Sequence, residues 1–411
     1  MSVRKRAWLN RDGSQGEAWV VAYTDQTGVR RIKTFDRKKD ADAFHAVVGV
    51  DVRKGIHVPD SQSITVAEAA ELWLESGEAE QLERSTLDSY RDHVTWHLTP
   101  LLGAIKLSQL SIPMVRHFED TLRKNRSPAM VRKVRSSLGA ILADAQERGL
   151  VARNVVRDLR GHRSRRKKGS GKRQDRRLQV GVDIPTPEEV RALLQQAEGH
   201  WRPFLMTAVF TGLRSSELRG LRWQDVDLEK GELHVRQRAD RYNEIGRPKS
   251  AAGTRTVPLP PALIHELRQW KLGCPKRIDQ HDKVGKLVLV FPNGRGNIEN
   301  NANLRQRGLV PAMLCAKVTR PVLDRHGHPK RDSAGKPLVQ AKYSGLHALR
   351  HFYASWCINR KVDGGLELPA KVVQERLGHA SIVMTMDTYG HLFPRNDDGT
   401  DLAAAASALL A

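Results

Sequence analysis

The 411-residue chain has few cysteines, few aromatic residues and no long apolar run. Its three cysteines form no CxxC pair, which argues against a disulfide framework and a zinc knuckle. Aromatic residues make up 5% of the chain, so a protein that binds single strands by base stacking is disfavoured. No apolar run reaches the roughly 18 residues of a membrane span, and the basic N-terminus lacks the apolar segment of a secretory signal. We therefore expect a protein of the reducing cytoplasm with no membrane partner.

Signatures of metal and nucleotide sites are also missing. The chain has 16 histidines, but neither an HExxH pair nor a carboxylate cluster accompanies them. A P-loop is absent as well. A two-metal nuclease is therefore disfavoured, and we expect no metal and no cofactor.

Positive charge is abundant. Lysine and arginine total 69 against 46 aspartates and glutamates, which gives a formal net charge of +23. This excess indicates a polyanionic partner, and nucleic acid is the first candidate. The length of the chain favours two or three domains.

The motif that carries chemistry begins with His347-Ala-Leu-Arg350-His351. His347 and Arg350 are three residues apart, so on a helix they lie on one face. Arginine pairs bidentately with phosphate, and histidine transfers protons near neutral pH. Alone, such a helix is more often a surface ion-pair face than a catalytic one.

Further along, the chain has Leu377-Gly378-His379 and a lone Tyr389. The Leu-Gly pair is typical of a helix end, which would hold His379 at a break between helices. Tyr389 offers a hydroxyl that can act as a nucleophile, although a single tyrosine near a C-terminus is usually a packing residue. Together with the histidine–arginine helix, these residues indicate a site that attacks a phosphodiester.

A second arginine, Arg214, stands in the motif TGLRSSEL at residues 211–218. With this motif, with HALRH, with LGHAS and with the Tyr-Gly-His at 389–391, the chain resembles the tyrosine recombinase (phage integrase) family. The resemblance covers the C-terminal half closely and the first half in general layout. It implies a site-specific DNA recombinase that cleaves and rejoins strands through a 3′-phosphotyrosine intermediate, and so integrates or excises a phage or other mobile element.

The resemblance also assigns roles to side chains. Tyr389 would attack a DNA phosphate and stay joined to the 3′ phosphate, which frees a 5′ hydroxyl. Arg214 and Arg350 would clamp the non-bridging oxygens of that phosphate, since a guanidinium is planar and always charged. His379 would donate a further hydrogen bond, and His347 would be the acid–base partner of the tyrosine hydroxyl.

Three more residues complete the expected site. Lys249 lies in the turn before the strand at 254–259, in the place of the family's hairpin lysine, and would protonate the leaving 5′ oxygen. Glu217 would orient an arginine or a histidine, whereas His351 is expected to be a packed structural residue. The predicted catalytic residues are Arg214, Lys249, His347, Arg350, His379 and Tyr389, with Glu217 behind them.

Two other functions share part of this pattern. A type IB topoisomerase has the same active-site layout but relaxes supercoils without a specific site or a partner protomer. A non-catalytic DNA-binding regulator with a relic site is the third hypothesis. The N-terminal module argues against the topoisomerase, and the completeness of the catalytic set argues against the regulator.

The chain divides into segments of different pattern. Stretches 18–23 and 29–35 are predicted as a β-hairpin, and the module around them resembles the arm-type DNA-binding domain of phage integrases. Helical periodicity then continues to about residue 159, as in the family's core-binding domain. The predicted segments are a small β-rich module at 1–58, an all-α core-binding domain at 64–160, a basic linker at 161–182, a mixed α+β but mainly helical catalytic domain at 183–395 and a C-terminal tail at 396–411.

Basic side chains in three of these segments are candidates for DNA contact. A basic sheet can lie in a major groove, and a basic helix stripe opposite an apolar one suits contact with phosphates. The alternative for each is an ordinary solvated surface. The candidates are Arg30, Arg31 and Lys33 of the module, Arg132, Lys133 and Arg135 of the helical domain, and Arg165, Arg166, Lys167 and Lys168 of the linker.

The resemblance implies partners as well. Double-stranded DNA attachment sites come first, with a homotetramer assembled on them, and an excisionase or a host DNA-bending protein is a further candidate. The expected location is the cytoplasm of a bacterial host, on DNA. The chain departs from the family in an inserted, turn-rich segment at 320–342, to which the sequence assigns no role.

Overall fold

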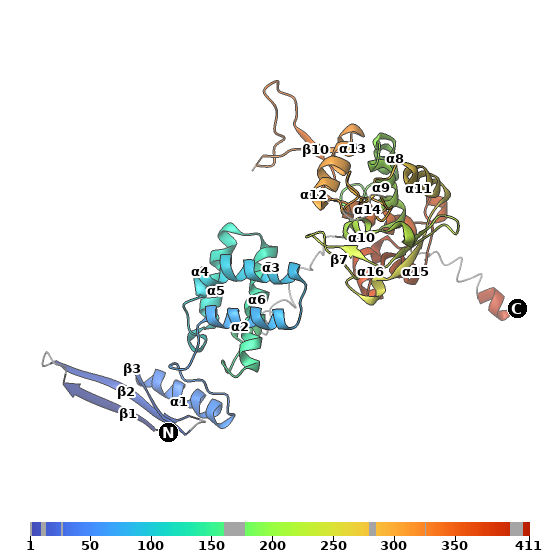
Figure 1. Cartoon of the computed structure of the whole chain (residues 1–411). Coiled ribbons are helices and arrows are strands. Elements are labelled where there is room, and N and C mark those ends of the chain that lie inside the picture. The colour runs from blue at the N-terminus through green and yellow to red at the C-terminus, as the bar shows by residue number, and fades with distance from the viewer. Residues whose placement is uncertain are drawn as a thin grey trace. The chain divides into compact units, whose positions relative to one another are not determined.

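The computed structural model describes residues 2–9, 14–25, 28–159, 177–278, 285–324, 326–394 and 406–411 (Figure 1). The chain forms two compact units, Met1–Gly171 and Lys172–Ala411. The first unit holds a strand module and a helical bundle, and the second is mainly helical with small sheets, which confirms the predicted fold class. The predicted basic run at 165–168 and most of the predicted tail lie outside the described residues.

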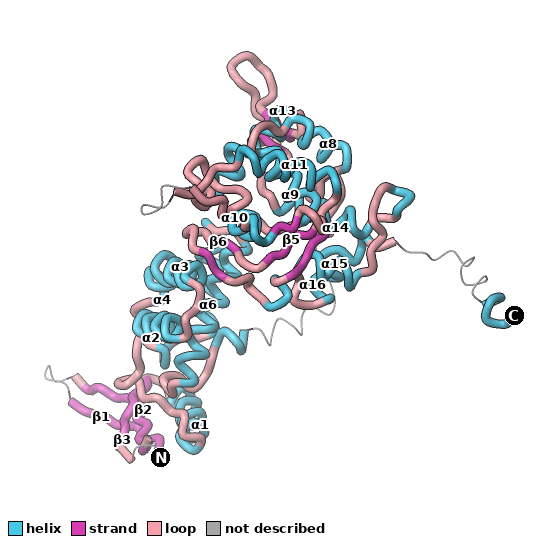
Figure 2. Tube along the Cα trace, turned by 45° about the vertical axis from the view of Figure 1, so that its right-hand side comes forward, coloured by secondary structure: helices cyan, strands magenta, loops and turns pink. Residues whose placement is uncertain are grey.

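The N-terminal module is a three-stranded antiparallel sheet with one helix (Figure 2). The strands β1 (Ser2–Leu9), β2 (Gln15–Thr24) and β3 (Arg30–Phe35) lie in the order β1-β2-β3, and α1 (Lys38–Arg53) follows. Strands β2 and β3 confirm the predicted hairpin, and β1 adds an edge to it. The core of the module consists of Val21, Tyr23, Ala41 and Val48.

The second part of the first unit is helical throughout, as the predicted all-α domain at 64–160 requires. A capping box of Thr65 and Glu68 starts the first helix. The second helix runs on through a π-helical segment, and the last buries Val131, Val134, Leu138, Ile141, Leu142 and Ala145. The segments are α2 (Val66–Ala79), α3 (Arg84–His93), η1 (Val94–Leu98), α4 (Thr99–Leu102), η2 (Leu107–Gln109), α5 (Ile112–Asn125) and α6 (Pro128–Glu147).

Helices form most of the second unit. Thr186 caps the first of them, and Pro187 occupies its first turn. Helices α9 and α14 pack against each other, and Phe204, Leu205 and Tyr353 are among their buried side chains. The helices are α8 (Pro187–Gln196), α9 (Trp201–Thr211), α10 (Ser215–Gly220), α11 (Pro261–Gly273), α12 (Asn301–Asn303), η5 (Leu304–Leu309), α13 (Val310–Cys315), α14 (His347–Ile358), α15 (Ala370–Leu377) and α16 (Ile382–Tyr389).

Three small antiparallel sheets complete the second unit. The sheet β4-β5-β8 contains both predicted strands, and Leu233 of β5 lies opposite Val257 of β8. None of the described helices is both long and apolar enough to span a membrane. The strands are β4 (Val226–Asp227), β5 (Glu232–Val235), β6 (Arg238–Ala239), β7 (Ile245–Gly246), β8 (Arg255–Pro258), β9 (Thr319–Pro321) and β10 (Val339–Ala341), and short 3₁₀ turns are η3 (Trp223–Asp225), η4 (Ala251–Gly253), η6 (Lys361–Asp363) and η7 (Gly390–Leu392).

Candidate active site

Arg350 lies at the centre of the candidate site. It comes from the first turn of α14 and is only 2% exposed. Its Nη1 donates to the carbonyl of Gly212 at 2.7 Å, and its Nη2 donates to the carbonyl of Leu377 at 2.5 Å. These carbonyls lie at the C-terminal ends of α9 and α15, where the helix dipole is negative. The guanidinium is therefore fixed in place by backbone alone.

Two glycines shape the backbone around this arginine. Gly212 ends α9 with φ +60°, in the left-handed region that glycine favours, and a Cβ there would lie 2.4 Å from Cδ1 of Tyr353. Gly378 ends α15 with φ +63°, which confirms the predicted helix break before His379. Both helix ends therefore require glycine, which the motifs TGLRSSEL and LGHAS have at these two positions.

A buried carboxylate orients a second arginine. Arg214 Nη1 donates to Glu217 Oε1 at 2.8 Å, and Nη2 donates to the carbonyl of Gly378 at 3.3 Å. On the other side of the carboxylate, Arg255 Nη2 donates to Oε2 at 2.9 Å, and Arg255 Nε donates to the carbonyl of Arg376 at 2.8 Å. Burial opposes ionisation of Glu217, but the two guanidinium groups lower its pKa to about 2.

Arg255 is absent from the sequence-based prediction. It opens the strand β8, which the sequence analysis does predict, and the motif TRTVPL therefore contains the signal. The motif predicts a strand but not the direction in which the Arg255 side chain points. Only the folded structure shows that Arg255 reaches Glu217.

His379 and Tyr389 face each other across the turn between α15 and α16. His379 Nδ1 lies 2.9 Å from Thr385 Oγ1, and its backbone carbonyl accepts from Gln374 Nε2. The rings of His379 and Tyr389 are parallel, with centroids 6.3 Å apart. Tyr389 ends α16 and is 1% exposed, so the candidate nucleophile lies inside its own chain.

The hydroxyl of Tyr389 is hydrogen-bonded to His351. The distance from its Oη to His351 Nδ1 is 2.7 Å. The predicted partner was His347, which lies one helical turn earlier, with its exposed ring edge-on to His351 at 4.6 Å between centroids. The structure thus places His351, and not His347, within hydrogen-bond distance of the tyrosine hydroxyl.

Charge in this cluster is positive and desolvated. Burial and the neighbouring Arg214 lower the pKa of Arg350 to about 9. Burial, together with nearby cationic groups, also lowers the pKa of His351 and of His379 to about 4. Burial raises the pKa of Tyr389 to about 12, although both arginines favour its ionisation. At neutral pH the site therefore holds neutral imidazoles, a protonated phenol and guanidinium charges that suit an anion.

Two predicted residues lie at the edge of this cluster. His347 is exposed, and partial desolvation together with Arg350 and Arg214 lowers its pKa. Lys249 lies in the exposed turn between β7 and η4. The structure thus brings Arg214, Arg350, His379 and Tyr389 together, with Glu217 behind them, and leaves Lys249 on the turn.

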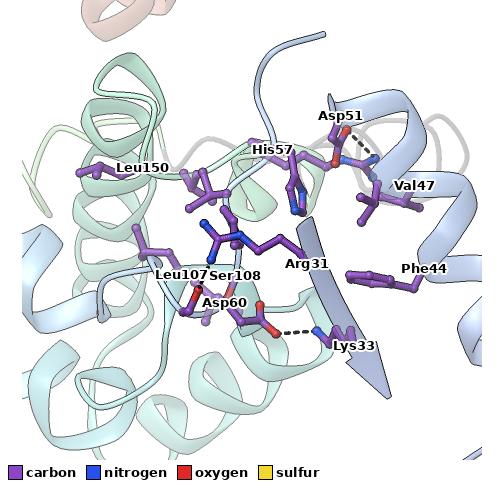
Figure 3. Close-up of a pocket in the computed structure, with 18 of the residues that line it drawn as sticks. Arg31, Lys33, Phe44, Val47, Asp51, His57, Asp60, Leu107, Ser108 and Leu150 are labelled. Atoms are coloured by element: carbon purple, nitrogen blue, oxygen red, sulfur yellow. Dashed lines mark hydrogen bonds and ion pairs between the residues drawn. The ribbon is translucent and has the colours of Figure 1, made fainter. Parts of the chain in front are cut away.

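The basic residues of β3 point to two sides of the sheet: Arg31 and Lys33 to one side, and Arg30 to the other. Arg31 Nε donates to Asp25 Oδ2 at 2.8 Å, and Lys33 Nζ pairs with Asp60 Oδ2 at 2.5 Å. Figure 3 shows both side chains at a cavity of about 450 Å³ that the module shares with the helical bundle. Lys33 also lies 4.6 Å above the ring of Phe44. The predicted DNA contacts of Arg31 and Lys33 are therefore at odds with their ion pairs.

Arg30, in contrast, lies on the opposite face and is exposed. Strand alternation and the β1–β2 register place Arg4 and Arg6 on that same face, beside Val20 and Ala18. The sequence analysis missed these two arginines because it did not include β1. The residues that could present a basic face are therefore Arg4, Arg6 and Arg30.

The predicted basic residues of α6 also differ in their surroundings. Arg135 Nη1 donates to Glu119 Oε1 at 3.0 Å, and Glu119 is buried. Arg135 thus stabilises the bundle, whereas Arg132 and Lys133 are exposed. The linker candidates Arg165, Arg166, Lys167 and Lys168 lie outside the described residues.

Known proteins resemble this chain over nearly its whole length. A tyrosine recombinase XerC-like protein of Caldanaerobacter subterraneus is 26% identical over 386 residues, which cover 87% of each chain. An integrase of Mycobacterium phage L5 is 27% identical over 65% of this chain and 71% of its own length. Among solved structures, the Tn1549 transposon integrase in complex with transposon right end DNA has a TM-score of 0.59 at 18% identity, and covers 84% of this chain and 99% of that chain. A lambda integrase dimer bound to a core site has a TM-score of 0.54 at 15% identity, with 93% of both chains covered.

Family models account for most of the sequence. The model described as the phage integrase central domain matches residues 66–162. The model described as the phage integrase family matches residues 185–395, just over half of the 411 residues. The chain therefore belongs to the phage integrase family, and it is a site-specific tyrosine recombinase.

Proposed function

We propose that the buried cluster around Arg350 cleaves DNA by transesterification, with Tyr389 as the nucleophile. The observation that carries this proposal is a pair of fixed arginines beside a buried tyrosine hydroxyl. Glu217 is shared between Arg214 and Arg255, so its charge does not neutralise Arg350. A DNA phosphate supplies the anion that this cluster is built to hold.

The reaction proceeds in two balanced steps. Tyr389 Oη forms a bond to phosphorus, the bond from phosphorus to the 5′ oxygen breaks, and a 3′-phosphotyrosine and a 5′ hydroxyl result. In the second step a 5′ hydroxyl of another strand attacks the phosphotyrosine and releases the tyrosine. Because one ester replaces another in each step, no nucleotide cofactor is required.

Charge stabilisation comes from the arginines and His379. Arg214 and Arg350 bind the non-bridging oxygens, on which negative charge grows in the transition state. With the Thr385 hydroxyl donating to Nδ1, the neutral ring of His379 carries its proton on Nε2 and donates it to the phosphate. Glu217 and Arg255 hold Arg214 in its orientation.

Proton transfer needs a base for the tyrosine and an acid for the leaving oxygen. His351 Nδ1 is 2.7 Å from the Tyr389 hydroxyl, so it is placed to accept the phenol proton as the bond to phosphorus forms. Lys249, on its exposed turn, approaches with the DNA and protonates the 5′ oxygen. The exposed His347 supports the phosphate from the edge of the site.

DNA attachment sites are the proposed partners, with a homotetramer assembled on the paired sites. A solved lambda integrase tetramer is bound to a Holliday junction, which supports this assembly for the present chain. An excisionase or a host DNA-bending protein is proposed as an accessory, and the cytoplasm of a bacterial host as the location. Arg4, Arg6 and Arg30 form the proposed DNA-facing side of the N-terminal sheet.

Replacement of Tyr389 by phenylalanine tests the nucleophile. Tyr389→Phe should bind DNA as the parent does but form no covalent adduct, because only the hydroxyl is lost. The readout is a denaturing gel on a nicked duplex taken from DNA that flanks the mobile element. A covalent adduct in Tyr389→Phe would overturn the assignment.

Variants of the two α14 histidines separate their roles. His351→Gln should slow adduct formation by about 10²-fold, the lower range for a lost general base, and His347→Gln should slow it less. A substrate with sulfur in place of the 5′ leaving oxygen needs no proton donor. It should therefore restore the rate of Lys249→Ala but not that of His351→Gln. A larger loss in His347→Gln would return the role of base to His347.

Acidification should destabilise the second unit through its buried histidines. The pKa of His351 and of His379 is about 4 in the folded chain, against about 6.5 in an unfolded one. The unfolded chain thus binds more protons in this window, so the stability that is present above about pH 6.5 is lost as the pH falls toward about 4. The double variant His351→Gln/His379→Asn should lose fewer degrees of Tm than the parent between about pH 7 and about pH 5. The exposed control His265→Gln should lose as many as the parent, and an equal loss in all three proteins would contradict the assignment.

The two faces of the N-terminal sheet can be compared by salt titration. Arg4→Gln/Arg30→Gln should make the dependence of log affinity on log salt shallower by about 2, or about 1 for each phosphate contact removed. The matched pair Arg31→Gln/Lys33→Gln should leave that slope unchanged, since both side chains already have carboxylate partners. A shallower slope in Arg31→Gln/Lys33→Gln, with an unchanged slope in Arg4→Gln/Arg30→Gln, would instead place DNA on the face of the sheet that carries α1.

A further inference from the structure

The segment between β9 and β10 contains a sequence repeat that the proposed mechanism does not use. Residues 324–329 and 332–337 share the pattern Asp-x-x-Gly-x-Pro, eight residues apart. In Figure 1 the segment projects beyond α13. We call residues 319–341 the twin hairpin.

The two repeats have the same backbone structure in the part of the segment that is described. Asp324 Oδ1 accepts from the backbone N–H groups of His326 and His328, and Asp332 Oδ1 accepts from those of Ala334 and Lys336. The glycines that follow have φ +87° and φ +78°. Each repeat is therefore a tight hairpin closed by its own aspartate.

Backbone hydrogen bonds join the two hairpins to one stem. Val322 N donates to the carbonyl of Leu338, Leu338 N donates to that of Lys330, and Lys330 N donates to that of Val322, at 2.8, 2.8 and 2.7 Å. This closed ring connects both hairpins to the β9–β10 ladder. Apolar packing contributes little, because Leu323 is 51% exposed and Val339 is 54% exposed. The twin hairpin thus holds its shape through its backbone and leaves its side chains to solvent.

Charge on this surface is predominantly positive. The carboxylates of Asp324 and Asp332 are engaged by backbone N–H groups. The side chains of Arg320, Lys330 and Lys336 are exposed. Arg331 is exposed as well, and its Nη1 donates to the carbonyl of Gly335. Among the described residues of the twin hairpin, four cations therefore stand against two carboxylates, and both carboxylates also accept backbone hydrogen bonds within the turns.

The base of the twin hairpin is anchored beside the catalytic helix. Lys342 N donates to the carbonyl of Val318 at 3.0 Å, and the Lys342 ammonium pairs with Glu189 of α8. Tyr343 is buried, and its hydroxyl donates to Glu189 Oε2 at 2.6 Å. His347 begins α14 only a few residues later. The segment is thus held by the same body that holds the active site.

We infer that the twin hairpin is a DNA-binding element that contacts the phosphate backbone of duplex DNA outside the cleavage site. The inference rests on the proposed function in one respect, that duplex DNA is the substrate. A preorganised projection on which exposed cations outnumber carboxylates is complementary to a polyanion. Interfaces between proteins are instead depleted of lysine at their cores, so a protein partner is the less favoured occupant.

Salt-dependent binding tests this inference in the full-length Tyr389→Phe chain, in which cleavage cannot intervene. The hairpin variant carries Arg320→Gln, Lys330→Gln and Lys336→Gln, and the probe is a long duplex of random sequence. The slope of log affinity against log salt should become shallower by about 2 to 3, since each phosphate contact contributes about 1. The control variant carries Lys230→Gln, Lys271→Gln and Lys361→Gln, which are exposed elsewhere on the second unit, and should keep the parental slope.

Three results would overturn the inference. An equal change in the control variant would mean that net charge acts rather than the twin hairpin. An unchanged slope in the hairpin variant would remove the DNA contact. Unchanged binding in Tyr389→Phe, with recombination reduced when the hairpin variant is made in the chain with Tyr389 intact, would instead indicate a protein partner on this surface. In the chain with Tyr389 intact, the hairpin variant should still form the covalent adduct at saturating DNA, so failure of the inference is distinguishable from failure of the catalytic proposal.

Discussion

The active site depends on one buried carboxylate. Glu217 accepts from Arg214 on one side and from Arg255 on the other, so two segments that are distant in sequence, the start of α10 and the start of β8, are held by a single charge cluster. Burying a lone guanidinium is costly, and a buried ion pair offsets that cost only when its geometry is well satisfied. Arg350 is stabilised differently, by two helix-end carbonyls, and it therefore keeps an uncompensated positive charge. Because Glu217 pairs with Arg214 and Arg255, the positive charge of Arg350 is available to a phosphate.

Local chemistry explains why much of this arrangement is predictable from sequence. The helix end at Gly378 is set by a short-range rule, and it is found as predicted. The family motifs likewise indicate the buried arginines and the tyrosine. Arg255 and His351 could not be assigned in this way, because their roles depend on which side chains α14, α16 and β8 bring together. A helix pattern states that His347 and His351 share a face, but not which turn of that face meets Tyr389.

In the N-terminal module, too, the sequence alone could not show which face of the sheet is covered. Strand alternation predicts that Arg30 and Arg31 point to opposite sides, but the choice of the covered side requires the position of α1. Once the helix is placed, Arg31 and Lys33 become structural cations that pair with Asp25 and Asp60. Which of the basic residues of this sheet face DNA therefore depends on the fold and not on strand alternation alone.

The sharing of Glu217 has a consequence for the decay of mobile elements. Loss of this carboxylate would leave the partly exposed Arg214 and the buried Arg255 without their shared counterion, so neither guanidinium would be held in its present orientation. A copy of the gene that retains its tyrosine and every arginine could therefore be inactive through this one position.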